Sequence, residues 1–123
     1  MQIKCSLDIG SWFDILAIYN VKINKCTGRK RAQNQENFKK LAAEIENQIG
    51  KLKFNNIIES DEYSELYDAN LKTFKMVELA QKDDGLAKQV DVSNYSRFLK
   101  KKALQKRFFD SEVKETKVGY LYE

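Results

Sequence analysis

Histidine is absent from this chain of 123 residues, and only two cysteines occur, Cys5 and Cys26. The chain therefore lacks the side chain that most often acts as a general base near neutral pH. Acid–base chemistry would fall to a carboxylate, lysine, cysteine or tyrosine. Without histidine and without a CxxC pair the sequence offers no ligand set for zinc, so we expect no metal. Two cysteines do not make a disulfide framework, so we expect reduced thiols.

Long apolar runs are missing as well. No stretch approaches the roughly 18 consecutive apolar residues of a membrane span. Residues 1–9 lack the basic region and apolar core of a signal peptide. Glycine-rich phosphate loops and the GxSxG, HExxH and EF-hand motifs do not occur either. We therefore expect a cytoplasmic protein with no cofactor and no membrane contact, and the sequence leaves open whether it is an enzyme.

What the chain does have is a predicted helix over residues 10–26 that is apolar on nearly every side. At about 100° per residue, its large apolar side chains leave no broad polar face. These side chains are Trp12, Phe13, Ile15, Leu16, Ile18, Tyr19, Val21 and Ile23. Such a helix belongs at the centre of a small helical protein, and we expect Trp12 to be buried there. The length of the chain suits a single domain over residues 1–123.

Apolar residues three and four apart predict further helices over residues 29–54, from about 61 to 80, and from 93 or 94 to 110. Residues 1–7 and 116–122 instead alternate apolar and polar side chains, which is typical of short strands. Because neither strand could be stable alone, we expect the two to pair. The predicted fold class is mainly α: a bundle of about four helices with a small strand pair formed by the N- and C-terminal segments.

The predicted helix over residues 29–54 bears on the state of assembly. A helix of this length would be nearly 40 Å long, which exceeds a compact monomer of this size. We therefore expect a homo-oligomer.

A polar stripe interrupts the apolar helix. Asp14, Ile18 and Lys22 are spaced four residues apart and so share one side of residues 10–26. A carboxylate on a buried helix must reach an edge, pair with another group or face a solvated cleft. Two interpretations follow: an edge with ordinary ion pairs, or a polar cleft beside the central helix with Asp14 and Lys22 as ligand-binding residues.

The last predicted helix is basic, with no acid between Arg97 and Phe109. Arg97 and Lys101 are one turn apart, so both could reach one phosphate or carboxylate, and Asn94 could add a contact from the helix N-terminus. Lys106 continues the run. The alternatives are a solvated face whose lysine stems cover the core, acidic side chains of another helix that neutralise these cations, or nucleic-acid binding.

Two stretches carry a resemblance to a known family. The first comprises residues 8–10, 14–16 and 21–23 (DIG, DIL and VKI), and the second comprises residues 90–95, 103–106, 108–109 and 117–120. Together they resemble a family of short bacterial and phage proteins known only as a domain of unknown function. The resemblance covers nearly the whole chain and implies a single helical domain, with no mechanism. It marks Asp14, Lys22, Asn94 and Lys106 as motif positions, whereas Asn20 stands where a glutamate is common.

These observations favour a non-catalytic cytoplasmic accessory or binding protein that recognises an anionic partner through its basic C-terminal helix, and they leave open that a phage encodes it. The expected partner is an anionic small molecule or an acidic protein surface. The alternative is a small all-α enzyme that binds a carboxylated or phosphorylated metabolite between helices through Lys22, Arg97 and Lys101. A nucleic-acid-binding protein is a third possibility.

Overall fold

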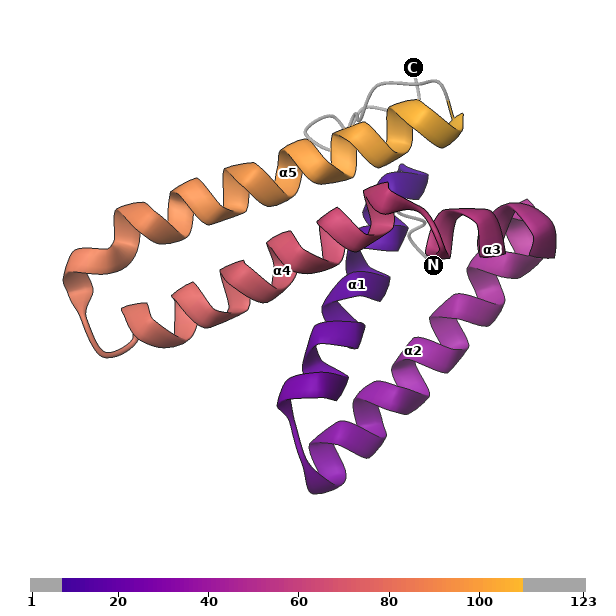
Figure 1. Cartoon of the computed structure of the whole chain (residues 1–123). Coiled ribbons are helices and arrows are strands. Elements are labelled where there is room, and N and C mark those ends of the chain that lie inside the picture. Colours follow the sequence, from indigo (N-terminus) through magenta and orange to yellow (C-terminus); the bar gives the residue numbers. More distant parts are fainter. Residues whose placement is uncertain (1–7, 110–123) are drawn as a thin grey trace, which may run out of the picture.

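A computed structural model describes residues 8–109 of the chain. Within this range the helices are α1 (Ile9–Lys25), α2 (Gly28–Ile49), α3 (Lys51–Ile58), α4 (Asp61–Ala80) and α5 (Ala87–Phe109), with a 3-10 turn η1 (Asp84–Leu86) before α5. Consecutive long helices form two hairpins, α1–α2 and α4–α5 (Figure 1). The two hairpins meet where α1 packs against both α4 and α5.

The predicted fold class, a bundle of about four helices with a strand pair, is wrong, because the strand pair is not seen among the residues that the structure describes. Residues 8–109 form five α-helices instead of about four, and they contain no strand. Both segments of the predicted strand pair, 1–7 and 116–122, lie outside the described residues. The mainly α class and the central place of the first helix are confirmed, because the core is assembled entirely from helices around α1.

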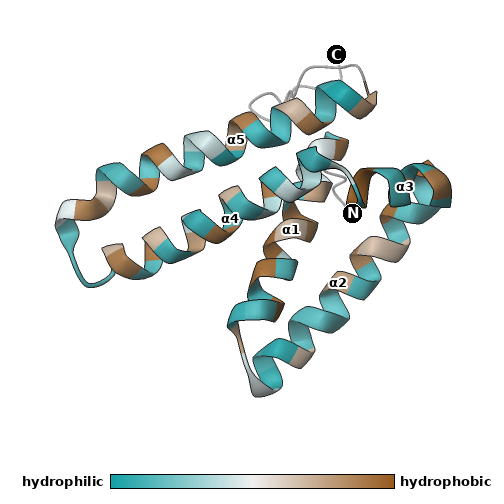
Figure 2. Cartoon of the chain, viewed as in Figure 1, coloured by the Kyte–Doolittle hydropathy of each residue, from teal (hydrophilic) through white to brown (hydrophobic). Residues whose placement is uncertain are grey.

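The core lies along one side of α1. Phe13, Leu16 and Ala17 are fully buried there, together with Ile57 and Leu66 from α3 and α4. Figure 2 shows α1 coloured as hydrophobic over most of its length, whereas α2 is mostly hydrophilic. Trp12, predicted to be central, is only partly buried and Phe13 takes that position. The reason is that Trp12 lies at the surface between α1 and α2, where it lines open pockets together with Leu41 and Glu44.

Gly50 divides the second predicted helix. Its φ of +92° lies in a region that side chains with a Cβ rarely adopt, and the chain turns there from α2 into α3. The helix of residues 29–54 that argued for self-association is therefore interrupted. Homo-oligomerisation stays a prediction without that support.

The start of α4 at Asp61 agrees with the predicted helix from about residue 61, and Ser60 caps it. The Ser60 hydroxyl accepts a hydrogen bond from the backbone N–H of Tyr63, at 3.1 Å, and donates to the carbonyl of Ile57, at 2.6 Å. The last helix begins earlier than predicted, at Ala87. As a result Asn94 lies inside α5, two turns from its beginning, and cannot offer the N-terminal contact expected of it.

Candidate functional site

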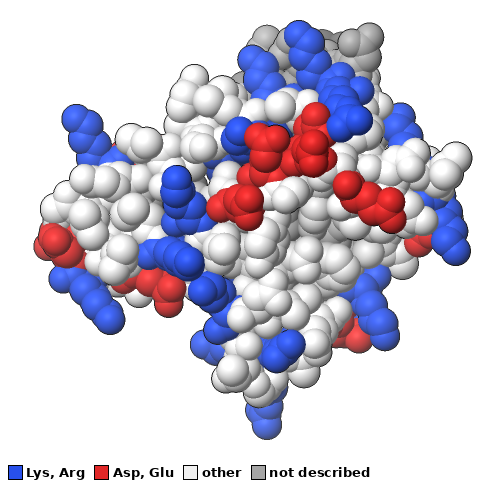
Figure 3. Space-filling model, in the orientation of Figure 1, with Lys and Arg blue, Asp and Glu red and all other residues white. Residues whose placement is uncertain are grey.

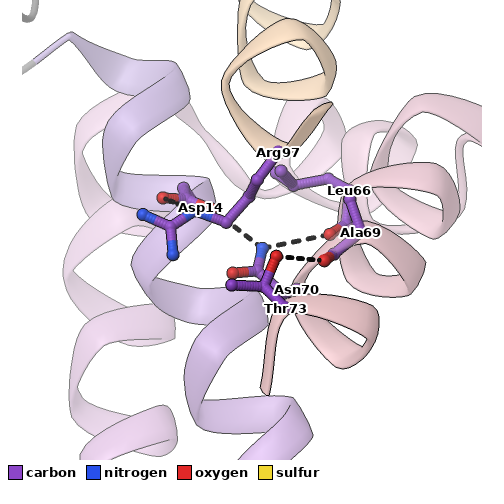
Figure 4. A network of polar contacts seen from close by, with 6 residues as sticks. All are labelled: Asp14, Leu66, Ala69, Asn70, Thr73 and Arg97. Atoms are coloured by element: carbon purple, nitrogen blue, oxygen red, sulfur yellow. Dashed lines mark hydrogen bonds and ion pairs between the residues drawn. The ribbon is translucent and has the colours of Figure 1, made fainter. Parts of the chain in front are cut away.

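The carboxylate of Asp14 lies at the point where α1, α4 and α5 cross. Asp14 is 5% exposed. Its Oδ1 accepts a hydrogen bond from Nδ2 of Asn70 on α4 at 2.8 Å, and its Oδ2 lies 3.6 Å from Nε of Arg97 on α5. Figure 4 shows the two side chains reaching the carboxylate from different helices. A buried carboxylate requires such partners, because an unpaired charge away from water is costly.

Two polar residues of α4 complete this network. Asn70 Nδ2 also donates to the carbonyl of Leu66 at 3.0 Å, and the Thr73 hydroxyl donates to the carbonyl of Ala69 at 2.9 Å. Both side chains are nearly fully buried. Sequence reasoning missed them as site residues, because Asn70 falls within the apolar stripe of its helix. The sequence does contain one clue: Asn70 places a polar amide on the apolar side of its helix, four residues after Leu66.

A small groove opens beside the network. Its volume is about 180 Å³, and it is lined by the apolar side chains of Ile18, Val21, Phe74 and Val77 and by the polar Asn70, Thr73 and Arg97. Lys22 lies one turn beyond Ile18 in the last turn of α1 and is half-buried. Asp14 and Lys22 are therefore not in contact, and of the two only Asp14 belongs to the buried network.

Lys101, the predicted partner of Arg97 in anion binding, is also turned inward. It is 3% exposed, and its Nζ lies 5.7 Å from the ring centre of Phe98. One turn further along, the Gln105 Oε1 accepts a hydrogen bond from the backbone N–H of Gly10 at 2.6 Å. A Cβ at Gly10 would lie only 3.1 Å from the carbonyl oxygen of Lys101, so the start of α1 and α5 approach closely there.

Acidic side chains of α4 neutralise other cations of α5. Lys100 Nζ lies 2.7 Å from Glu65 Oε1, and Arg107 pairs with Glu62. Figure 3 shows acidic side chains gathered over α4 with basic side chains directly beside them. The basic run of the sequence is thus divided between a buried side, a side paired with α4 and an outer face.

The outer face of α5 combines apolar and basic side chains. Val92 and Tyr95 are each 63% exposed and Leu99 is 44% exposed. Lys88 and Lys106 are exposed at the two ends of this stripe, at helical spacings that place all five residues on one side. Asn94 is exposed but belongs to a different side of the helix.

Asparagine and tyrosine side chains join α1 to α4 further along the crossing. Asn20 Nδ2 donates to the Tyr63 hydroxyl at 3.1 Å, and Asn24 Nδ2 donates to the Tyr67 hydroxyl at 2.7 Å. Burial raises the pKa of Tyr63 to about 12, against an ordinary value of 10.0. The polar residue Asn20 therefore contributes a specific contact between helices.

Other kinds of site find little support among residues 8–109. No three histidine, cysteine, aspartate or glutamate side chains gather there as ligands for a metal ion. None of the helices in this range combines the length and apolar character needed to cross a membrane. Comparison of the chain with protein families, with curated proteins and with solved structures finds no match. Its function must be inferred from its own residues.

Proposed function

We propose that this protein is a non-catalytic binding protein that recognises an acidic protein surface through the outer face of α5. The observation that supports it is the exposure of Val92, Tyr95 and Leu99 between Lys88 and Lys106. Exposed apolar side chains at this spacing on a helix match the way an amphipathic helix binds a partner. Tyrosine in particular is frequent where protein surfaces bind one another.

The charges of this face indicate the chemistry of the partner. Lys88 and Lys106 are about 27 Å apart along the helix, at the two ends of the apolar stripe. A second copy of α5 laid against the first, in either direction, would bring lysine against lysine. Like charges across an interface disfavour binding, whereas carboxylates at both ends of a partner's apolar stripe would be attracted. The proposed partner is therefore a different, acidic protein.

A designed peptide tests this proposal directly. The probe is a helical peptide with leucines spaced three and four residues apart and glutamates flanking them. Its control carries lysines in place of the glutamates. Wild-type protein is expected to bind the acidic peptide at least about tenfold more tightly, with affinity that falls as salt rises. Fluorescence anisotropy of the labelled peptide measures both affinities.

Two variants show whether the outer face of α5 is responsible. Tyr95→Asp is expected to abolish binding, whereas Leu79→Asp, at an exposed apolar position on α4, should leave it unchanged. Equal affinity for the two peptides, or full binding by Tyr95→Asp, would overturn the proposal. Oligonucleotide binding that depends on Lys88 and Lys106 but not on Tyr95 would replace it with a nucleic-acid function. A self-associating wild type that Tyr95→Asp makes monomeric would replace it with a homo-oligomer.

A further inference from the structure

The groove between α1, α4 and α5 differs from the outer face of α5 in that polar groups converge on it. Ile18 and Val21 of α1 face Phe74 and Val77 of α4 across the groove, and Arg97 of α5 lines it together with Asn70 and Thr73. Apolar walls with a few fixed polar groups are the usual composition of a small-molecule site. The volume of about 180 Å³ limits the occupant to a short aliphatic or single-ring molecule.

The guanidinium of Arg97 forms an ion pair with Asp14 but keeps N–H donors without a partner among the described residues. A guanidinium carries five N–H donors. Within residues 8–109 the only polar partner of Arg97 is Asp14, which lies 3.6 Å from Nε. The side chain is 31% exposed and lines the groove. A fixed guanidinium with unused parallel donors matches the two oxygens of a carboxylate.

The charges around the groove favour a single negative charge on the ligand. Arg97 is the one charged residue among the described residues that line the groove, and the negative charge of Asp14 lies 3.6 Å from its Nε. The side chain of Lys22 has no ion pair or hydrogen bond within the described part of the chain, and it follows Ile18 by one helical turn. A ligand with two or more negative charges would be repelled by the carboxylate of Asp14.

We propose that this groove binds a small apolar monocarboxylate, whose carboxylate is held by the guanidinium of Arg97 and whose apolar part lies against Ile18, Val21, Phe74 and Val77. Asp14 and Asn70 act as positioning residues, because Asp14 orients Arg97 and Asn70 holds Asp14 (Figure 4). This site shares no residue with the outer face of α5, so ligand binding in the groove can be tested independently of the proposed function.

Titration with four small molecules tests the site. Hexanoate and benzoate are the probes, and their uncharged amides, hexanamide and benzamide, are the controls. Nitrogen–proton correlation spectra of the full chain report on the side-chain signals of Arg97 Nε–H and the Asn70 amide. Both carboxylates are expected to shift these signals saturably. The amides should bind at least about tenfold more weakly, because they lack the charge-assisted hydrogen bonds.

Variants of the groove separate binding from folding. Arg97→Gln should abolish the shift of the Asn70 amide signal, with Arg107→Gln as the matched arginine control. Because removal of Arg97 also affects folding, Val77→Glu provides a second variant: it places a carboxylate at an exposed position lining the groove, where it should prevent binding. Leu79→Glu on the same helix, outside the groove, is its control.

The proposal is overturned if neither carboxylate produces saturable shifts, if the amides bind equally well, or if Val77→Glu binds as the wild type does. Tyr95→Asp should bind hexanoate normally. A protein that binds hexanoate but not the acidic peptide would refute the proposed function and retain this site, and the reverse result would retain only the proposed function.

Discussion

The two sides of α5 invert the usual relation between burial and polarity. The side turned toward α1 and α4 buries Ser93, Lys101 and Gln105 and ties Arg97 to Asp14, with Leu104 as its fully buried apolar residue. The opposite side exposes Val92, Tyr95 and Leu99. Polar contacts therefore set how α5 crosses the other helices, while apolar side chains remain available at the surface.

This difference means that the two sides of α5 contribute differently to folding. Buried polar groups restrict a helix to arrangements in which each finds its partner, which favours a single packing geometry. Exposed apolar side chains contribute little to folding, and the proposed function gives those of α5 a role as a binding surface. The predictions below test this division, beginning with the largest expected effect.

Two leucines on opposite sides of α5 give the sharpest contrast. Leu104→Ala removes a side chain with 0% exposure and should lower the free energy of unfolding by about 2–5 kcal/mol. Leu99→Ala, at 44% exposure, should change it by about 0.5 kcal/mol or less. Urea denaturation measures both values. Similar losses in the two variants would contradict the division between the sides.

The buried phenol of Tyr63 should make stability depend on alkaline pH. The folded protein holds the phenolic proton more tightly than the unfolded chain does, because burial raises its pKa to about 12 from 10.0. This contribution is fully present below pH 10 and is lost as pH rises from 10 to about 12, with a total of about 2–3 kcal/mol. Denaturation across this range should show a steeper decline for wild type than for Tyr63→Phe. Tyr95→Phe, at an exposed position, should keep the wild-type dependence.

The close approach of α1 to α5 should make an added methyl group harmful. Gly10→Ala is expected to cost about 1–2 kcal/mol, although alanine favours a helix over glycine by about 1 kcal/mol. The reason is that the new Cβ would lie 3.0 Å from Gln105 Oε1 and 3.1 Å from the backbone oxygen of Lys101. A thermal melt of Gly10→Ala, Gln105→Ala and the double variant measures the coupling. The double variant should lose less than the sum of the single losses, and a more stable Gly10→Ala would show that the contact is not tight.

The exposed ion pair between α4 and α5 should contribute least. Lys100 and Glu65 are 40% and 53% exposed, so water and salt screen their attraction. A double-mutant cycle with Lys100→Ala and Glu65→Ala should give a coupling of about 0.2–1 kcal/mol that declines in high salt. A larger, salt-resistant coupling would mean that α5 is fixed by this pair as much as by its buried side.

Periodicity was sufficient to predict most of the helical residues, but not the division of α2 from α3 or the start of α5. The stripes that define α4 and α5 recur every three to four residues, and the Ser60 cap follows from its side-chain chemistry. The break at Gly50 depends on a backbone angle that the sequence permits without requiring, since an isolated glycine also occurs inside helices. The burial of Trp12 depends on which sides of α1 the other helices cover, and the local sequence pattern does not contain that information.

The candidate site was only partly predictable for the same reason. Asp14 stood out because a carboxylate on an apolar helix needs a partner, and the structure supplies Arg97 from a helix 83 positions away in sequence. The inward side of α5 could not be identified from its sequence, because apolar residues occur on both of its sides. Arg97 and Lys101 were correctly grouped on one side, but only the packed structure shows that this side faces α1.

The contact between Gly10 and Gln105 has a consequence for synthesis of the protein. It joins residues that are 95 positions apart, so α1 leaves the ribosome long before the helix that completes its packing. The hairpin of α1 and α2 can form early, but the packing of α1 against α4 and α5 forms only after those helices have emerged. During that interval α1, the most apolar helix among the described residues, is incompletely covered, so we expect it to be the segment of the nascent chain most exposed to aggregation.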